Sequence, residues 1–165
     1  MSELGRVVIE DCRKKLVEAY PAQIREALAA LDDEDVWSRP NAAANSVGNL
    51  ILHLVGSSRH FIGRGLGGSD YLRDRAGELS ERGPVPRVEL ERQLDEAAAE
   101  TARVLDGLDP DALLETADIG GEPHTPLALL VRVAHHWAVH AGQIVYVAKA
   151  RREGAIDEVW RRTMG

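Results

Sequence analysis

The chain has 165 residues, of which 44% are hydrophobic and 28% are charged. This composition is typical of globular proteins and excludes the disordered and fibrous classes. A chain of this length usually forms about one domain, so we expect residues 1–165 to make up a single domain. The formal net charge is −7, and no run of Lys and Arg is longer than three residues, which argues against a nucleic-acid partner.

Neither a membrane span nor a signal peptide is predicted. A span needs about 18 consecutive apolar residues, and the sequence contains no such stretch. The N-terminus MSELGRVVIEDCRKK has acidic and basic residues where a signal peptide needs an apolar core. We therefore expect a cytoplasmic protein with no membrane partner. Its single cysteine, Cys12, cannot form an internal disulfide and is interpreted as a half-buried structural thiol.

The first half of the chain predicts two helices. Apolar residues at spacings of three and four favour one long helix from about Glu3 to Leu31, and Pro21 should kink or break it. The polar stretch that follows predicts a loop, ending at two residues that could cap the next helix, Asn45 and Ser46. A second helix is expected from Val47 to about Ile62, where a group of glycines should end it.

The second half predicts two more helices. Residues 69–87 have no sustained period and are expected to form a long connection that crosses the bundle. Residues 88–105 favour a third helix by propensity and spacing. After a second polar connection, Thr125 and Pro126 are typical of an N-cap and a first helical residue, and the fourth helix should run to about Arg152. Without any alternating strand pattern, these elements predict an all-α four-helix bundle.

The fourth helix contains the hexapeptide HHWAVH, which has half of the six histidines of the chain. Because a helix turns about 100° per residue, His136 and His140 lie ~40° apart, on one flank of the apolar face. His135 lies ~140° from His140 and cannot share that face. Two histidines at this spacing can bind one divalent transition metal ion, although ordinary hydrogen-bonding histidines have the same pattern.

A third ligand has to come from another helix, and His53 is the natural candidate. It lies on the flank of the apolar face of the second helix, where a neutral or metal-bound imidazole is tolerated and a free imidazolium is costly. A lone buried histidine is more often structural, so His53 alone proves little. His60, seven residues further on, is the second choice. Trp137, next to His136, either walls the site or simply belongs to the core.

Two motifs resemble those of the DinB-like metal-binding proteins. The stretch NSVGNLILHLVGSSRHFI is similar to the second-helix motif of that family, and VAHHWAVHAGQI is similar to its fourth-helix signature. The resemblance implies that His53, His136 and His140 bind a divalent metal ion, most often zinc or nickel. It further implies an up-down-down-up bundle with the metal near one end, and a homodimer. Where the family often has an arginine after the last histidine, this sequence has Ala141.

Three neutral histidines leave at least one coordination position open, which is the catalytic rather than the structural pattern for zinc. A thiol in that position would lose its proton. Relatives in the wider superfamily use low-molecular-weight thiols, so the first hypothesis is a metal-dependent enzyme, either a thiol S-transferase or a hydrolase. Gln143 and Tyr146 are candidates for orienting the ligands.

Two alternatives remain open. The first is a non-catalytic metal-binding or stress-response protein, which predicts a closed site with a fourth ligand such as Asp11 or Glu18. The second is a helical bundle whose three histidines are merely polar. The sequence does not identify the substrate, the general base, or the roles of His60, His135 and Cys12.

Overall fold

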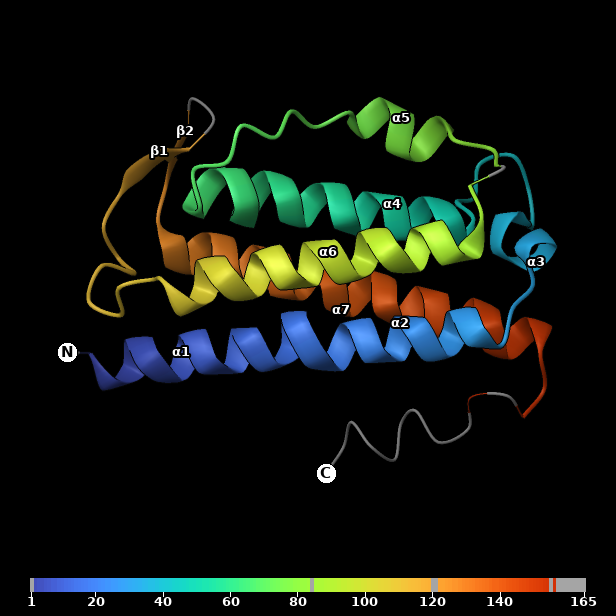
Figure 1. Ribbon diagram of the computed structural model, residues 1–165, viewed down its shortest axis with the longest axis horizontal. Helices are drawn as coiled ribbons and strands as arrows, with labels where there is room; N and C mark the ends of the chain where they lie inside the picture. The colour runs from blue at the N-terminus through green and yellow to red at the C-terminus, as the bar shows by residue number, and fades with distance from the viewer. Residues whose placement is uncertain (1, 84, 120–121, 155, 157–165) are drawn as a thin grey trace.

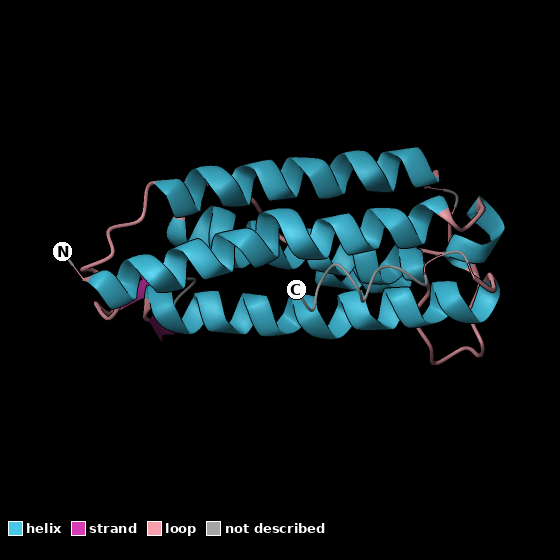
Figure 2. Cartoon of the chain, turned by 90° about the horizontal axis from the view of Figure 1, so that it is seen from below, coloured by secondary structure: helices cyan, strands magenta, loops and turns pink. Residues whose placement is uncertain are grey.

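The computed structural model describes residues 2–83, 85–119, 122–154 and 156. Its fold is mostly helical, as the sequence predicts, and its long helices lie lengthwise beside one another (Figures 1 and 2). The elements, in chain order, are α1 (Glu3–Arg13), η1 (Lys14–Ala19), α2 (Tyr20–Ala29), α3 (Asp33–Trp37), α4 (Val47–Ser58), η2 (Arg59–Leu66), α5 (Arg75–Ser80), α6 (Arg87–Asp106), β1 (Ala117–Ile119), β2 (Glu122–His124) and α7 (Pro126–Arg151). Among the described residues, no helix combines the length and apolar character needed to cross a membrane.

The first long helix passes through Pro21 without ending. The segments α1, η1 and α2 follow one another without a gap, and η1 has the wider π-helical turn. At its end the N–H of Tyr20 bonds to the carbonyl of Lys15, five residues back. Proline removes a backbone donor and crowds the preceding turn, and a π-helical turn is a known way to absorb such a disruption. The helix therefore does not break at Pro21. It changes from α-helical to π-helical turns just before that residue.

The second long helix is longer than predicted. Beyond Ile62 it continues as η2 to Leu66, although glycines begin at Gly63. A Cβ atom at Gly63 would overlap the carboxylate of Glu100 on α6. Gly63 therefore leaves room for the Glu100 side chain and does not end the helix. The predicted group of glycines does end it four residues later than expected, where Gly67 is the C-cap and Gly68 has a φ of 71°. At the other end Ser46 is the N-cap, and its side chain accepts from the N–H of Asn49.

The last two long helices match their predicted bounds closely. Helix α6 differs by one residue at each end from the predicted 88–105. Helix α7 begins at Pro126, and the hydroxyl of Thr125 accepts a hydrogen bond from the N–H of Ala128, as expected of an N-cap. In Figure 1 the connection between η2 and α6 runs back along α4, so α6 starts at the same end of the molecule as α4.

Four short elements were missed. Helices α3 and α5 lie in segments predicted as loops, and each follows an aspartate N-cap, Asp32 and Asp74. Strands β1 and β2 form a small antiparallel hairpin in the second polar connection. Segments of three to six residues are too short to show a hydrophobic period, so spacing arguments do not detect them.

A hydrophobic core lies between the long helices and contains the largest buried side chain, Trp137. The indole N–H of Trp137 donates to the hydroxyl of Ser58 over 2.7 Å, which satisfies both buried polar groups. Trp137 therefore belongs to the core and does not wall the site.

Cys12 is a buried free thiol of the same core, and burial raises its pKa. Trp160 lies outside the described residues.

Two helical glycines, Gly5 on α1 and Gly142 on α7, differ in how closely they are packed. A Cβ at Gly5 would overlap the backbone carbonyl of Pro110, which cannot rotate away, whereas a Cβ at Gly142 meets nothing within 4 Å. We expect Gly5→Ala to lower the free energy of unfolding of the metal-free protein by about 1–3 kcal/mol. Gly142→Ala should raise it by about 0.5–1 kcal/mol, because alanine favours a helix interior. Urea titration measures both, and equal effects of one sign would contradict this packing.

Candidate metal centre

Three histidines from two helices come together at one place. His53 lies on α4, and His136 and His140 lie one turn apart on α7. One ring nitrogen of each lies within 4.8 Å of the other two, and all three side chains are partly buried. The ring centroid of His53 lies 4.8 Å from the ring centroid of His136 and 5.4 Å from that of His140. The ring centroids of His136 and His140 are 4.5 Å apart. The helical geometry that excludes His135 and includes His53 therefore predicts the observed cluster.

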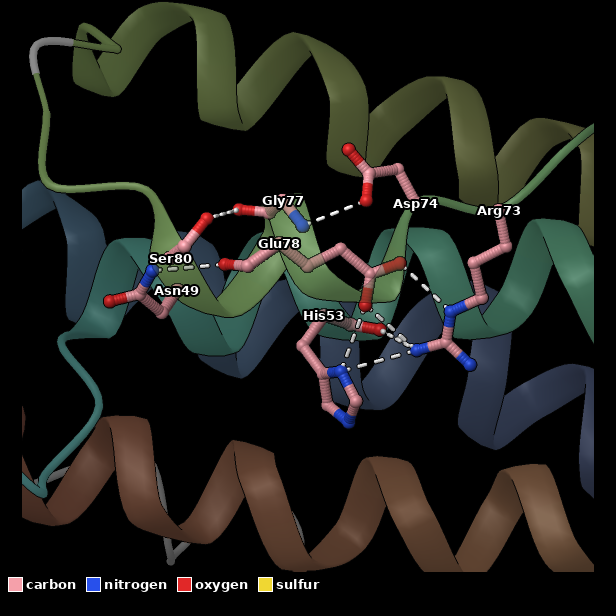
Figure 3. Close-up of polar contacts among 7 residues, drawn as sticks. All are labelled: Asn49, His53, Arg73, Asp74, Gly77, Glu78 and Ser80. Carbon is pink, nitrogen blue, oxygen red and sulfur yellow. Dashed lines mark hydrogen bonds and ion pairs between the residues drawn. The ribbon is translucent and has the colours of Figure 1, made fainter.

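His53 is oriented by a carboxylate that sequence reasoning missed. Its Nδ1 lies 2.9 Å from Oε2 of Glu78, which belongs to α5 (Figure 3). Because an ionised carboxylate only accepts, Nδ1 carries the proton and donates it. This leaves Nε2 of His53 with a free lone pair. A carboxylate that holds a histidine in this tautomer is a common partner of metal-binding histidines.

Arg73 holds the carboxylate of Glu78 in place. Its Nε and Nη2 donate to the two carboxylate oxygens of Glu78, each over 2.8 Å (Figure 3). Both side chains are close to fully buried, with 11% and 8% of their surface exposed. This bidentate pair compensates two charges that would be costly alone. Nη2 also lies 3.1 Å from Nδ1 of His53, but that nitrogen already donates to Glu78, so Arg73 instead donates to the carbonyl of His53.

Helix α5 is anchored on α4 by its backbone as well as by Glu78. The side-chain amide of Asn49 donates to the carbonyls of Glu78 and Glu81, each over 2.9 Å. Asn49 lies four residues before His53, so both side chains leave the same face of α4. At Gly56, on the next turn of that face, a Cβ would overlap the carboxylate of Glu78. These contacts place the carboxylate directly against His53.

Gln143 orients a second histidine. Its amide oxygen lies 2.6 Å from Nδ1 of His140, and accepting from that nitrogen leaves Nε2 unprotonated. The expectation that Gln143 orients a ligand is therefore supported by a contact. Tyr146, the other candidate, is 74% exposed, and no contact to the cluster is found for it among the described residues.

The third histidine has a nitrogen without a partner. Nδ1 of His136 is buried and makes no hydrogen bond within the described part of the chain. The pKa of His136 is lowered to about 4, first by burial and then by the nearby His140, His53, Arg73 and Arg132. Burial also lowers the pKa of His53, against the opposing effect of Glu78. Both rings are therefore neutral at neutral pH, which is the form that binds metal ions.

These observations fit a divalent transition metal ion. Three imidazoles converge, two of them have Nδ1 directed to an acceptor, and the third has an orphaned buried nitrogen. The two carboxylates considered as a fourth ligand do not belong to the cluster. Asp11 is exposed and pairs with Lys15, and Glu18 is exposed and pairs with Arg13. Within the described residues, the group of metal-binding side chains contains only the three histidines.

A cavity of about 570 Å³ opens beside His53 and His136. It lies between α4, η2, α5 and α7. Its lining includes His60 and His135, which are not part of the cluster of three, and it is completed by Ser57, Phe61, Arg73, Arg75, Arg132 and Val139. The cavity makes the histidine cluster accessible to a small molecule.

Two solved structures share this fold. A conserved protein from Enterococcus faecalis matches with a TM-score of 0.70 at 18% sequence identity, covering 90% of this chain and 97% of its own. A DinB-like protein, YjoA, from Bacillus subtilis matches with a TM-score of 0.65 at 18% identity, covering 87% of this chain and 94% of its own. At this identity the likeness concerns the fold, and it supports the DinB-like fold that the two sequence motifs predict.

Residues 3–160 match the model of a family described as "Protein of unknown function (DUF1572)", and the chain belongs to that family. Among curated proteins, no relative matches this sequence.

The contact between Glu78 and His53 makes a prediction about metal affinity. We expect Glu78→Gln to weaken metal binding about 10–100-fold, because the neutral amide stabilises the metal-bound imidazole less than a carboxylate does. Gly56→Ala should weaken it as well, by displacing Glu78. Competition with a chromophoric chelator measures the affinity. The control is Glu81→Gln, whose carboxylate accepts from the N–H of Arg82 and makes no other hydrogen bond or ion pair with a described residue. Unchanged affinity in Glu78→Gln would contradict the assignment.

The lowered pKa of His136 makes a prediction about acid stability. Between pH ~6.5, the unfolded value, and about 4, the unfolded chain binds a proton at this residue that the folded chain does not. The metal-free protein should therefore lose stability as the pH falls through this range. We expect His136→Gln to reduce that loss and the exposed His135→Gln to leave it unchanged. Urea midpoints at several pH values test this, and an identical pH dependence in His136→Gln would refute it.

Proposed function

We propose that His53, His136 and His140 bind one divalent transition metal ion, zinc or nickel, and that the protein is a metal-dependent enzyme of the thiol S-transferase type. The observation that carries this proposal is the convergence of the three imidazoles beside a cavity. The two helices that bear them come from distant parts of the chain. A purely structural histidine needs a hydrogen-bond partner, and His136 Nδ1 has none among the described residues.

The ligand set favours catalysis over a purely structural role. When bound, the ion acts as a Lewis acid that lowers the pKa of a thiol or water in its open position. Glu78 and Gln143 keep Nδ1 of His53 and His140 protonated, so their Nε2 atoms are the available ligands. A closed site would need a fourth side chain, and neither Asp11 nor Glu18 supplies one.

The arrangement of the bundle belongs to the same proposal. We assign the chain an up-down-down-up four-helix bundle. Support comes from the course of the ribbon in Figure 1, where α4 and α6 start at the same end and the chain returns along α7. Homodimer formation and a cytoplasmic location, which the resemblance and the composition favour, remain predictions.

The first test is the metal content of protein purified without an affinity tag. We expect about one divalent ion per chain, lost in His53→Ala, His136→Ala and His140→Ala, because each removes one of three ligands. His135→Ala is the matched control, since this neighbouring histidine is exposed and lies outside the cluster. A wild-type protein that contains no metal and takes up neither zinc nor nickel would refute the proposal.

A second measurement separates the enzyme from a non-catalytic metal protein. After cobalt substitution, a cellular thiol that enters the open position should change the visible absorption of the ion. A full complement of metal with no spectral response to any low-molecular-weight thiol would favour a structural or sensory ion.

A further inference from the structure

The cavity beside the histidine cluster is basic although the chain as a whole is acidic. The formal net charge of the chain is −7. The residues that line the cavity nevertheless include Arg73, Arg75 and Arg132, and no Asp or Glu is among them. Such a local excess of positive charge attracts anions and concentrates them at the site.

Arg132 is held in place without being neutralised. Its guanidinium lies over the ring of Phe61, 4.4 Å from the ring centroid, in a cation–π contact. Among the described residues, no carboxylate forms an ion pair with it. A stacked guanidinium loses side-chain freedom but keeps its hydrogen-bond donors, which suits it to bind an incoming carboxylate or phosphate.

Arg75 and Arg73 differ in how much of their charge is available. Arg73 is buried in its bidentate pair with Glu78, so its charge is compensated. Arg75 is the first residue of α5, is exposed, and has no ion pair with a described residue. The cavity therefore has two arginines, Arg75 and Arg132, whose charge is uncompensated within the described chain.

His60 adds a buried polar nitrogen to the cavity lining. Its Nδ1 is buried and has no hydrogen-bond partner in the described residues. The pKa of His60 is lowered first by burial and then by the positive charges of Arg73, Arg64 and Arg132. His60 is therefore neutral and keeps a polar nitrogen at the cavity that no described group satisfies.

We propose that this cavity binds the carboxylate or phosphate group of a small organic anion, with Arg132 and Arg75 as its binding residues. Phe61 and Val139 line the same cavity and offer an apolar surface to the body of the molecule. The inference deepens the proposed function, on which it rests for one point: the anion is a substrate whose reacting end reaches the metal ion. Binding of the anion by the arginines does not itself require the metal.

The test uses benzoate and phenyl phosphate as probes and neutral benzamide as their control. Titration calorimetry on the full-length protein, with and without bound metal, measures the affinity. We expect both anions to bind and benzamide not to bind, with affinity falling as salt increases. Arg132→Gln and Arg75→Gln should each weaken binding about tenfold, because each removes charge-assisted hydrogen bonds. Arg132→Lys should weaken it less, since the charge remains.

The matched control is Arg92→Gln, an exposed arginine of α6 that pairs with Glu89 and Glu96 and does not line the cavity. Metal content and the thermal midpoint are measured in every variant to exclude loss of the fold. Anion binding that is equal in wild type and both cavity variants, or that needs the metal and ignores the arginines, overturns the proposal. Arginine-dependent binding by a chain that takes up no metal supports the anion site and refutes only the metal-dependent function.

Discussion

The hydrogen bond from His53 to Glu78 is the interaction on which the candidate site depends. It joins the second long helix to α5, which lies in the connection that returns the chain along that helix. Without it, the Asn49 side chain would still hold α5 on α4 through the carbonyls of Glu78 and Glu81, but His53 would lack the acceptor that sets its tautomer. The connection that looks like a mere crossover in the sequence thus supplies part of the chemistry.

The same carboxylate links two electrostatic requirements. Glu78 accepts a hydrogen bond from His53, and a buried carboxylate is costly unless a positive charge compensates it. Arg73 supplies that compensation through two hydrogen bonds. Because the charge of Arg73 is compensated by Glu78, this pair adds little net charge to the cavity. The attraction for an anion therefore depends on Arg75 of α5 and Arg132 of α7, which line the same cavity.

Much of the site was predictable from particular residues. His136 and His140 share a face because they are four residues apart on a helix whose N-cap, Thr125, is visible in the sequence. His53 followed from its place on the flank of an apolar helix and from the DinB-like motifs. The group of glycines ends the second long helix at Gly67 and not at Gly63, because a glycine that ends a helix and one that leaves room for a neighbouring side chain look the same in one sequence. Helix α5 was missed because six residues are too few to show a period.

The sequence by itself determined the long helices and the pairing of histidines along them, since helical periodicity and capping act between residues a few positions apart. Only the tertiary structure decided that Glu78, 25 residues from His53, accepts a hydrogen bond from its Nδ1. It also brought Arg75 to the same cavity as Arg132 and stacked Arg132 on Phe61. Contacts of this kind depend on how α5, η2 and α7 pack against one another, and no local spacing rule encodes that packing.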